Sequence, residues 1–188
     1  CKIIFSSTMI RKIVPHIIYL IFFLLLFTNY SASSNWNPAK EGNKIIFIRH
    51  ALAPGGGDPK EFSLDDCKTQ RNLNQIGIDQ SKKIGKLFNE NNIKIDQVYS
   101  SQWCRCKDTA KYAFKNFKEL SALNSTFSPP YDQKEKEQIK ELKNFVENWE
   151  GNGGNLILVT HYVVILAVTG LAPSSGELVI VDKNFNIL

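Results

Sequence analysis

Apolar residues gather in four short runs along this chain, each bounded by polar or turn-forming residues. The runs cover residues 44–48, 95–100, 156–160 and 177–182. Short runs rich in apolar and β-branched side chains are typical of buried strands. The pattern therefore predicts four strands at these positions.

Between these runs, apolar residues recur at helical spacing. The spacing predicts helices over 75–89, 103–114, 134–149 and 162–169. In the first helix we expect one apolar face, made by Ile76, Ile84, Leu87 and Phe88. We expect the hydroxyl of Ser101 to cap the second helix. The alternating lysines and glutamates over 134–143 indicate a solvated helix face.

Strands that alternate with helices along a chain are typical of an α/β fold. We therefore expect a three-layer α/β/α sandwich around a mostly parallel central sheet. The segments left over predict connections: a polar linker at 35–43, a loop rich in glycine and proline at 54–59, and irregular structure at 120–133.

The N-terminal part of the chain differs in character from the rest. A basic start with Arg11 and Lys12 leads into an apolar stretch over 13–27, and small residues follow at 31–34. This order is typical of a secretory signal peptide. The stretch is shorter than the roughly 20 residues of a membrane-spanning helix.

We therefore expect residues 1–33 to be a signal peptide and residues 34–188 to form a single domain. Met9 is the only methionine, so we expect translation to start there, with residues 1–8 as upstream read-through. The mature protein is expected to be exported, either periplasmic or secreted. An uncleaved leader that anchors the protein to a membrane is the alternative.

The charge of the chain is concentrated in this leader. It contributes +3 of the net charge of +5, and residues 34–188 carry 20 basic and 18 acidic side chains. Such an even balance is a poor match to a nucleic-acid-binding surface. We expect no nucleic-acid partner, and membrane contact only through an uncleaved leader.

Three cysteines, Cys67, Cys104 and Cys106, fall within the part expected to be exported. In an oxidising compartment Cys67 can pair with either of the other two, and three buried thiols are the alternative. Cys104 and Cys106 stand too close together to pair easily within one helix. A single Cys-x-Cys is also a poor zinc pattern, so we expect no metal.

Two of the predicted strands end in a histidine. His50 follows the first strand directly after Arg49, and His161 follows the strand at 156–160. Ligands of parallel α/β folds collect at the carboxyl ends of strands, so we expect these side chains to share a pocket. Imidazole can attack phosphorus, and a planar guanidinium binds two phosphate oxygens at once. The pattern thus predicts nucleophilic chemistry on an anion.

Four segments, in this order, resemble the histidine phosphatase superfamily, also called the phosphoglycerate mutase-like or acid phosphatase-like family. They are Ile48-Arg49-His50-Ala51, residues 71–77, the Ser-Ser-x-x-x-Arg-x-x-x-Thr-Ala pattern over 100–110, and Val159-Thr160-His161. The resemblance covers about 44–182. It implies a phosphoglycerate mutase-like fold and a small exported phosphatase that uses neither metal nor organic cofactor.

The resemblance also implies a role for each of these side chains. His50 is the expected nucleophile, and His161 is the expected second catalytic histidine on the opposite side of the phosphate. Arg49 and Arg105 are expected to bind the phosphate. Arg71 is a further phosphate-binding candidate, for which a surface salt bridge is the alternative.

The proton donor that many family members use has no clear counterpart here. Tyr162 follows His161 where one branch of the family carries an aspartate, and residues 123–127 hold no carboxylate. The candidates by loop position are Asp58, Asp66 and Glu177. A missing acid favours substrates with good leaving groups over alkyl phosphates.

Together these features predict a phosphatase that hydrolyses phosphomonoesters through phospho-His50. The expected substrate is a phosphorylated small molecule or glycan. Two alternatives are kept: a phosphohistidine or phosphoprotein phosphatase, and a non-catalytic phosphate-binding module of the same fold. A serine hydrolase is disfavoured because the chain has no Gly-x-Ser-x-Gly motif.

Overall fold

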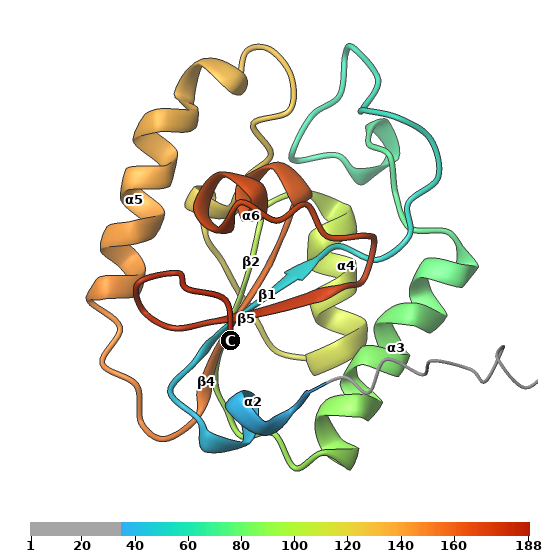
Figure 1. Ribbon diagram of the computed structural model, residues 1–188. Coiled ribbons are helices and arrows are strands. Elements are labelled where there is room, and N and C mark those ends of the chain that lie inside the picture. The colour runs from blue at the N-terminus through green and yellow to red at the C-terminus, as the bar shows by residue number, and fades with distance from the viewer. Residues whose placement is uncertain (1–34) are drawn as a thin grey trace, which may run out of the picture. The chain divides into compact units, whose positions relative to one another are not determined.

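The computed structural model describes residues 35–188, which form a five-stranded sheet flanked by helices (Figure 1). The strands are β1 (Ile45–Arg49), β2 (Ile95–Ser100), β3 (Lys118–Glu119), β4 (Asn155–Thr160) and β5 (Leu178–Val181). Their order in the sheet is β3-β2-β4-β1-β5. The first four strands in this order are parallel, and β5 pairs antiparallel with β1.

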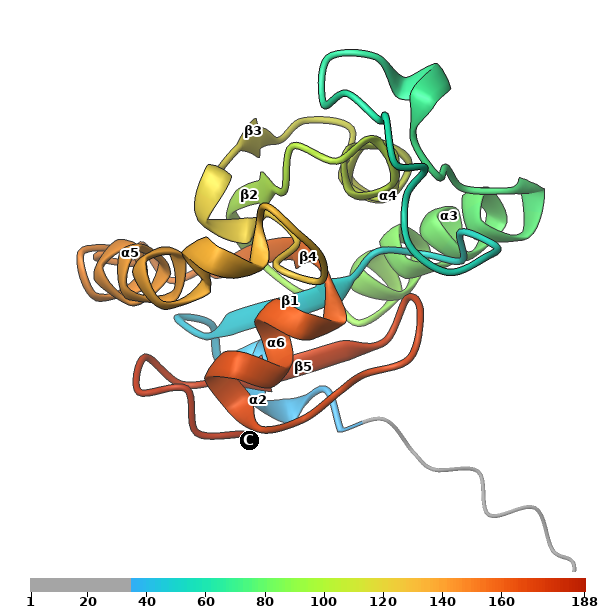
Figure 2. The same ribbon diagram turned by 90° about the horizontal axis from the view of Figure 1, so that it is seen from above.

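The helices lie on both faces of this sheet. They are α2 (Asn37–Glu41), α3 (Gln75–Glu90), α4 (Cys104–Phe114), α5 (Glu135–Glu147) and α6 (Tyr162–Thr169). Figure 2 shows α3 and α4 grouped together, apart from α5 and α6. Three short 3-10 turns, Cys67–Thr69, Ser121–Leu123 and Asp132–Lys134, lie in the connections.

Successive side chains of a strand point to opposite faces, so the side chains of each central strand pack alternately in two separate cores. Ile45 and Phe47 of β1 pack in a core with α5 and α6. Ile46 and Ile48 pack in the other core, with α3 and α4. Burial on both faces explains why β1 and β4 are continuous apolar runs rather than alternating ones. The expected three-layer α/β/α sandwich is confirmed.

The predicted elements match the observed ones to within two residues at each end, but two short elements were missed. The segment 35–43 is not a linker throughout, because it contains α2, whose Ala39 is fully buried. β3 lies within a stretch that showed no strand pattern, since it pairs with β2 over only two residues. Elements of this length are too short to show a period.

Two side-chain predictions for the helices are wrong. Ile76 is 64% exposed, because the buried face of α3 begins at Gly77, one residue further on. Ser101 does not cap α4. Trp103 holds the N-cap position without a side-chain bond, and the Ser101 hydroxyl bonds to Asn124 and His161 instead.

The predicted leader lies outside the described residues, and so do its read-through and its cleavage region at 31–34. In the part of the chain that is described, none of the helices has the length and apolar character needed to cross a membrane.

Helix α3 is docked tightly on the segment that follows β1. The backbone N–H of Leu52 donates a hydrogen bond of 2.9 Å to Oε1 of Gln80 in α3. At the start of the helix, Gly77 lies so close that a Cβ there would stand 2.2 Å from the Leu52 carbonyl oxygen. Glycine at position 77 therefore allows the close approach that fixes the chain just after His50.

We expect Gly77→Ala to lower the free energy of unfolding by about 1–3 kcal/mol, although alanine is the better helix former. The added methyl group would displace the Leu52 carbonyl. Gly56→Ala is the control, because a Cβ at Gly56 meets no atom within 4 Å and its φ is not positive. Urea unfolding of the three proteins measures the effect. A Gly77→Ala protein as stable as the wild type would contradict the packing argument.

Candidate active site

A cavity of ≈ 300 Å³ lies at the carboxyl ends of β1 and β4. The two histidines and three arginines singled out in the sequence all line it: His50, His161, Arg49, Arg71 and Arg105. The glycine-rich loop over 54–57 also contributes to the lining, together with several aromatic side chains. The structure thus brings together five residues that span more than half of the chain.

The ring of His50 is held in one tautomer. Its Nδ1 lies 2.8 Å from the carbonyl oxygen of Ala51. Because a carbonyl oxygen only accepts, Nδ1 must carry the proton and donate it. The other ring nitrogen, Nε2, is then left with an unprotonated lone pair, which is the form needed for nucleophilic attack.

His50 is also held neutral. It is 2% exposed. Burial, followed by the charge of Arg105, lowers its pKa to about 3, even though the hydrogen bond to Ala51 acts in the opposite direction. At neutral pH the ring is therefore unprotonated at Nε2, and no general base is needed to activate it.

His161 lies beside His50, with the two ring centroids 5.4 Å apart. Nη2 of Arg105 lies 3.4 Å from its Nδ1, and because a guanidinium only donates, Nδ1 is the acceptor. Nε2 then carries the proton and donates to Oγ of Ser101 at 3.0 Å. The Ser101 hydroxyl donates in turn to Oδ1 of Asn124 at 3.1 Å. This chain of donors fixes the orientation of the ring.

The pKa of His161 lies well below its ordinary value. Burial is the main cause, and the charge of Arg105 adds to it. Cys106, whose Sγ lies 3.4 Å from Nε2 of His161, is a fully buried thiol, and burial raises its pKa to about 12. It is therefore a packing residue here, not a nucleophile.

Two of the three arginines, Arg49 and Arg71, are held by backbone carbonyl groups. Nη1 of Arg49 donates to the carbonyl oxygen of Pro173 at 2.9 Å, and its guanidinium lies 5.1 Å from the centre of the Tyr162 ring. Arg71 donates from Nε to the carbonyl oxygen of Gly57 at 2.9 Å, and from Nη1 to that of Ala53. Arg71 therefore braces the glycine-rich loop and makes no surface salt bridge.

Two guanidinium nitrogens at the site are buried donors without a partner in the described structure. They are Nε of Arg49 and Nε of Arg105. A buried N–H that makes no hydrogen bond costs about 1–3 kcal/mol. An anion with several acceptor oxygens would remove that cost, so these atoms favour a phosphate ligand.

Asp58 is the one carboxylate among the residues that line the cavity. Its Oδ1 and Oδ2 lie 2.8 and 3.1 Å from Nη1 of Arg105. Oδ2 also accepts from Nε1 of Trp103 at 3.0 Å, and Oδ1 from the backbone N–H of Arg71 at 3.0 Å.

Burial alone would raise the pKa of Asp58. The charge of Arg105 and the three hydrogen-bond donors outweigh burial and hold the pKa below its ordinary value. Asp58 is therefore ionised at neutral pH. Of the other proton-donor candidates, Asp66 caps a 3-10 turn through Lys68 N–H, and Glu177 accepts from Ser174 N–H. Both are exposed and lie outside the cavity lining.

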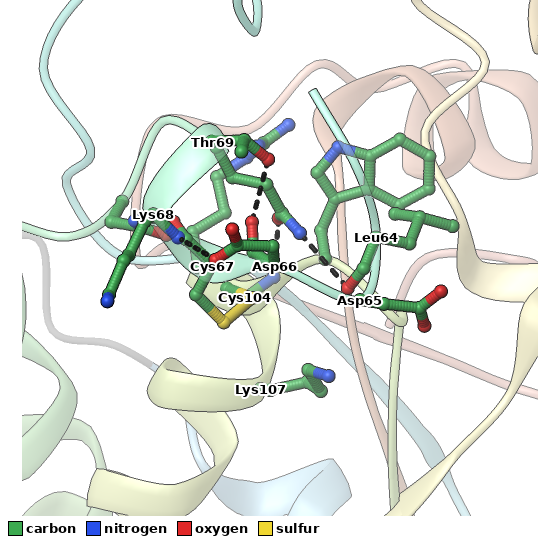
Figure 3. Close-up of a disulfide and its surroundings, with 12 residues drawn as sticks. Leu64, Asp65, Asp66, Cys67, Lys68, Thr69, Cys104 and Lys107 are labelled. Atoms are coloured by element: carbon green, nitrogen blue, oxygen red, sulfur yellow. Dashed lines mark hydrogen bonds between the residues drawn. A yellow bond between two sulfur atoms is a disulfide. The ribbon is translucent and has the colours of Figure 1, made fainter. Parts of the chain in front are cut away.

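A disulfide fastens the rim of the site to α4. Cys67 is bonded to Cys104, and of the three cysteines within residues 35–188, Cys106 keeps a free thiol. Figure 3 shows Cys67 in its 3-10 turn above the first turn of α4, where Cys104 lies. A second link runs in parallel, from the backbone N–H of Cys104 to Oε1 of Gln70 at 2.9 Å. Cys104 stands between Trp103 and Arg105 in the sequence, so both links hold cavity residues in place.

Several site residues carried no signal in the sequence. Asn124 orients the His161 chain through the Ser101 hydroxyl, but an asparagine in an irregular segment has no pattern to mark it. The aromatic side chains Phe62, Phe127 and Tyr131 line the cavity from loops that are distant in the sequence. A helix or strand period cannot reveal residues of this kind.

Comparison with known proteins places these features in a family. The model of the histidine phosphatase superfamily, branch 1, matches residues 45–155. The 2,3-bisphosphoglycerate-dependent phosphoglycerate mutases of Lactobacillus acidophilus and Lactobacillus johnsonii are each 30% identical over 81 residues, 42% of this chain and 32% of theirs. The match thus spans about a third of the length of these relatives.

Solved structures of related proteins share the fold. TTHB049 from Thermus thermophilus superposes with a TM-score of 0.53 at 17% identity, over 77% of this chain and 96% of that chain. The protein histidine phosphatase SixA, complexed with tungstate, gives 0.50 at 12% identity, over 77% and 92%. A phosphoserine phosphatase from Entamoeba histolytica gives 0.53 at 13% identity, over 73% and 89%. At these identities the likeness extends to the fold alone.

Acid is expected to destabilise the fold through His50. Its pKa falls from 6.5 to about 3 on folding, so between these pH values the unfolded chain binds more protons than the folded one. The free energy of unfolding therefore falls as pH falls through this window, by up to about 1.4 kcal/mol per pH unit for one such histidine. Chemical denaturation at several pH values measures the slope. We expect a shallower slope for His50→Asn, and an unchanged slope would contradict the assignment.

Loss of the disulfide is expected to destabilise the protein by about 3–4 kcal/mol, because a loop of this length is no longer closed in the unfolded chain. The separation of Cys67 and Cys104 is 37 residues. The variant is Cys67→Ser with Cys104→Ser, followed by thermal and urea unfolding. As a control, a thiol reductant should lower the stability of the wild type and leave the double variant unchanged. A wild type that does not respond to the reductant would contradict the pairing.

Proposed function

The chain belongs to the histidine phosphatase superfamily, and on that premise we propose that it hydrolyses phosphomonoesters through a phosphohistidine formed on His50. The observation that carries the proposal is the state of the His50 ring. Nδ1 donates its proton in a hydrogen bond to the Ala51 carbonyl oxygen. Burial and the charge of Arg105 lower the pKa of the ring, so that Nε2 stays unprotonated. A nucleophile is thus ready inside a cavity lined by three arginines.

In the first step, the Nε2 lone pair of His50 attacks phosphorus. A P–N bond forms while the P–O bond to the leaving group breaks, and the leaving oxygen keeps the electron pair. In the second step, water attacks the phosphoryl group and the P–N electron pair returns to Nε2. The proton that the water loses is taken up by the oxygen anion released in the first step. The net reaction consumes one water and releases an alcohol and inorganic phosphate.

The arginines supply the charge that this transfer requires. A phosphoryl group in transfer spreads negative charge over its non-bridging oxygens, and fixed positive groups stabilise that charge without reorganising. We propose that the unpartnered Nε donors of Arg49 and Arg105 bind these oxygens. Nε2 of His161 keeps its proton and donates it in a hydrogen bond to Oγ of Ser101, so we propose that this ring acts by orienting Arg105 through Nδ1.

Asp58 is proposed to position Arg105 and not to donate a proton. It binds Nη1 of Arg105 through both carboxylate oxygens, and this contact holds the guanidinium at the site. A carboxylate held ionised by three donors has no proton to give.

We also propose that turnover needs no metal ion. Three guanidinium groups line a cavity of ≈ 300 Å³, enough positive charge for one phosphoryl group. Over residues 35–188, no group of three or more histidine, cysteine and acidic side chains is arranged to hold a metal.

One alternative activity has a specific observation in its favour. The ionised Asp58 leaves the lining without a protonated carboxyl group, and a phosphohistidine substrate would need less help in departure than an alkyl phosphate. The same observation suits a phosphate-binding module without turnover. Measurement of hydrolysis separates these functions.

We also propose that the protein is exported. The disulfide between Cys67 and Cys104 supports it, since such bonds persist mainly in oxidising compartments. In that setting we propose a phosphorylated small molecule as the substrate, with a phosphorylated glycan as the alternative that the substrate comparison below tests.

The test is hydrolysis of para-nitrophenyl phosphate by the full chain with EDTA present. We expect activity that survives the chelator and falls by ~10³-fold or more in His50→Ala, because the attacking nitrogen is lost. Labelled phosphate should be trapped on the wild type after a basic quench, in which phosphohistidine is stable, and not on His50→Ala.

The conservative control is Thr69→Ser, which keeps a hydroxyl in the turn outside the cavity lining and should leave activity unchanged. Full activity in His50→Ala would overturn the nucleophile assignment. Activity abolished by EDTA would overturn the metal-free mechanism.

A further inference from the structure

One wall of the cavity is built from aromatic rings. The rings of Phe62, Trp103 and Tyr131 contact one another, with centroids 4.9 to 5.9 Å apart. The Trp103 ring also stands edge-on to His161, at 5.3 Å. All three line the same cavity as the catalytic histidines. Trp103 is buried, and Phe62 and Tyr131 are partly exposed, so these two rings form the apolar surface of this wall while Trp103 supports them from behind.

A second aromatic pair lines the same cavity. The rings of Phe127 and Tyr162 lie 6.1 Å apart, and the guanidinium of Arg49 lies over the Tyr162 ring. Phe127 is 55% exposed, which is unusual for a phenylalanine. An exposed phenylalanine beside a phosphate-binding arginine is placed to contact the organic part of a phosphate ester.

Outside the phosphate-binding groups, this lining holds few charged or amide side chains that could bind a sugar or an amino alcohol. Among the residues that line the cavity, none is a lysine, glutamate, asparagine or glutamine. The single carboxylate, Asp58, is occupied by Arg105, Trp103 and Arg71. Apart from the arginines and histidines assigned to the phosphate, the other polar side chains of the lining are the hydroxyl groups of serines and tyrosines. The lining therefore offers an organic group more ring surface than directed hydrogen bonds.

The ionisation of Asp58 independently favours substrates whose leaving group is aromatic. With no protonated carboxyl group in the lining, the leaving oxygen departs as an anion. A phenol has a pKa of about 10, as tyrosine does, whereas an alkoxide is far more basic. A phenolate therefore leaves without an acid far more easily than an alkoxide does.

We infer that this cavity is built for aryl phosphates, esters in which the phosphate is carried by an aromatic ring, such as a tyrosine side chain. This inference rests on the proposed phosphatase function. The ring of the leaving group lies against Phe127, Phe62 and Tyr131, while the phosphate contacts the arginines.

The step balances without an added acid. When Nε2 of His50 bonds to phosphorus, the P–O bond breaks and the phenolate keeps the electron pair. The phenolate then accepts the proton released by the water that hydrolyses phospho-His50. The products are a neutral phenol and inorganic phosphate.

The test separates the contribution of an aromatic ring to binding from the contribution of a good leaving group. Benzyl and ethyl phosphate both release poor alkoxide leaving groups, but only benzyl phosphate carries a ring. We expect the wild type to have a higher kcat/KM for benzyl than for ethyl phosphate, and the highest for phenyl phosphate. Equal values for benzyl and ethyl phosphate, or a preference for a hexose phosphate or a phosphohistidine peptide over phenyl phosphate, would overturn the inference.

Phe127→Ala is expected to lower kcat/KM for phenyl phosphate by about 3- to 10-fold, which corresponds to the loss of one aromatic contact, and to lower kcat/KM for ethyl phosphate by a smaller factor. Phe127→Leu should recover part of the loss and Phe127→Tyr most of it. Tyr112→Ala is the matched control, because Tyr112 is an exposed aromatic residue of α4 outside the cavity lining. An equal loss on both substrates in Phe127→Ala would overturn the role of this ring.

Binding distinguishes failure of this inference from failure of the proposed function. Phenylphosphonate and methylphosphonate cannot be hydrolysed, and calorimetry measures their affinities without turnover. Tighter binding of phenylphosphonate than of methylphosphonate, together with weaker binding of phenylphosphonate by Phe127→Ala, would support the aromatic site. If the same protein hydrolysed no ester, only the proposed catalytic function would be refuted. Equal affinities for the two phosphonates would overturn the aromatic site.

Discussion

The parallel pairing of β1 with β4 is the constraint on which the site depends. The register places Arg49 opposite Thr160, and the backbone N–H of His50 extends the ladder by donating to the Thr160 carbonyl at 2.9 Å. The two histidines, each the next residue after its strand, therefore leave the sheet at the same level. A shift of one residue in either strand would exchange the side chains that pack in the two cores and separate the rings, so the same apolar packing that holds the fold also sets the distance between the histidines.

Charge around the histidines follows from this arrangement. Three guanidinium groups line the cavity against one carboxylate, so the protein groups of the site carry an excess of positive charge. That excess, added to burial, keeps both imidazoles neutral, and it is the charge that an incoming phosphate would neutralise. Asp58 moderates the repulsion by occupying one side of Arg105. Nucleophile activation and anion binding are thus two effects of the same cluster.

The sequence was a good guide wherever a period or a strand end was involved. The central strands, the four long helices and the placement of His50 and His161 follow from buried faces, which leave regular traces in the sequence. Asn124, Phe127 and Tyr131 could not be found in this way, because they reach the site from an irregular segment between the edge of the sheet and α5. The choice of Cys104 over Cys106 also needed the structure, since the direction in which each thiol faces depends on how α4 is docked.

The antiparallel return of β5 along β1 sets the order in which the site is completed during synthesis. The segment leading into β5 passes over the end of β1, where Gly176 N–H donates to the carbonyl oxygens of Arg49 and His50 and the Pro173 carbonyl accepts from the Arg49 side chain. His50 leaves the ribosome more than a hundred residues before these partners. The nascent chain therefore carries His50 long before the backbone segment that holds the end of β1, and these contacts can form only after that segment has been synthesised.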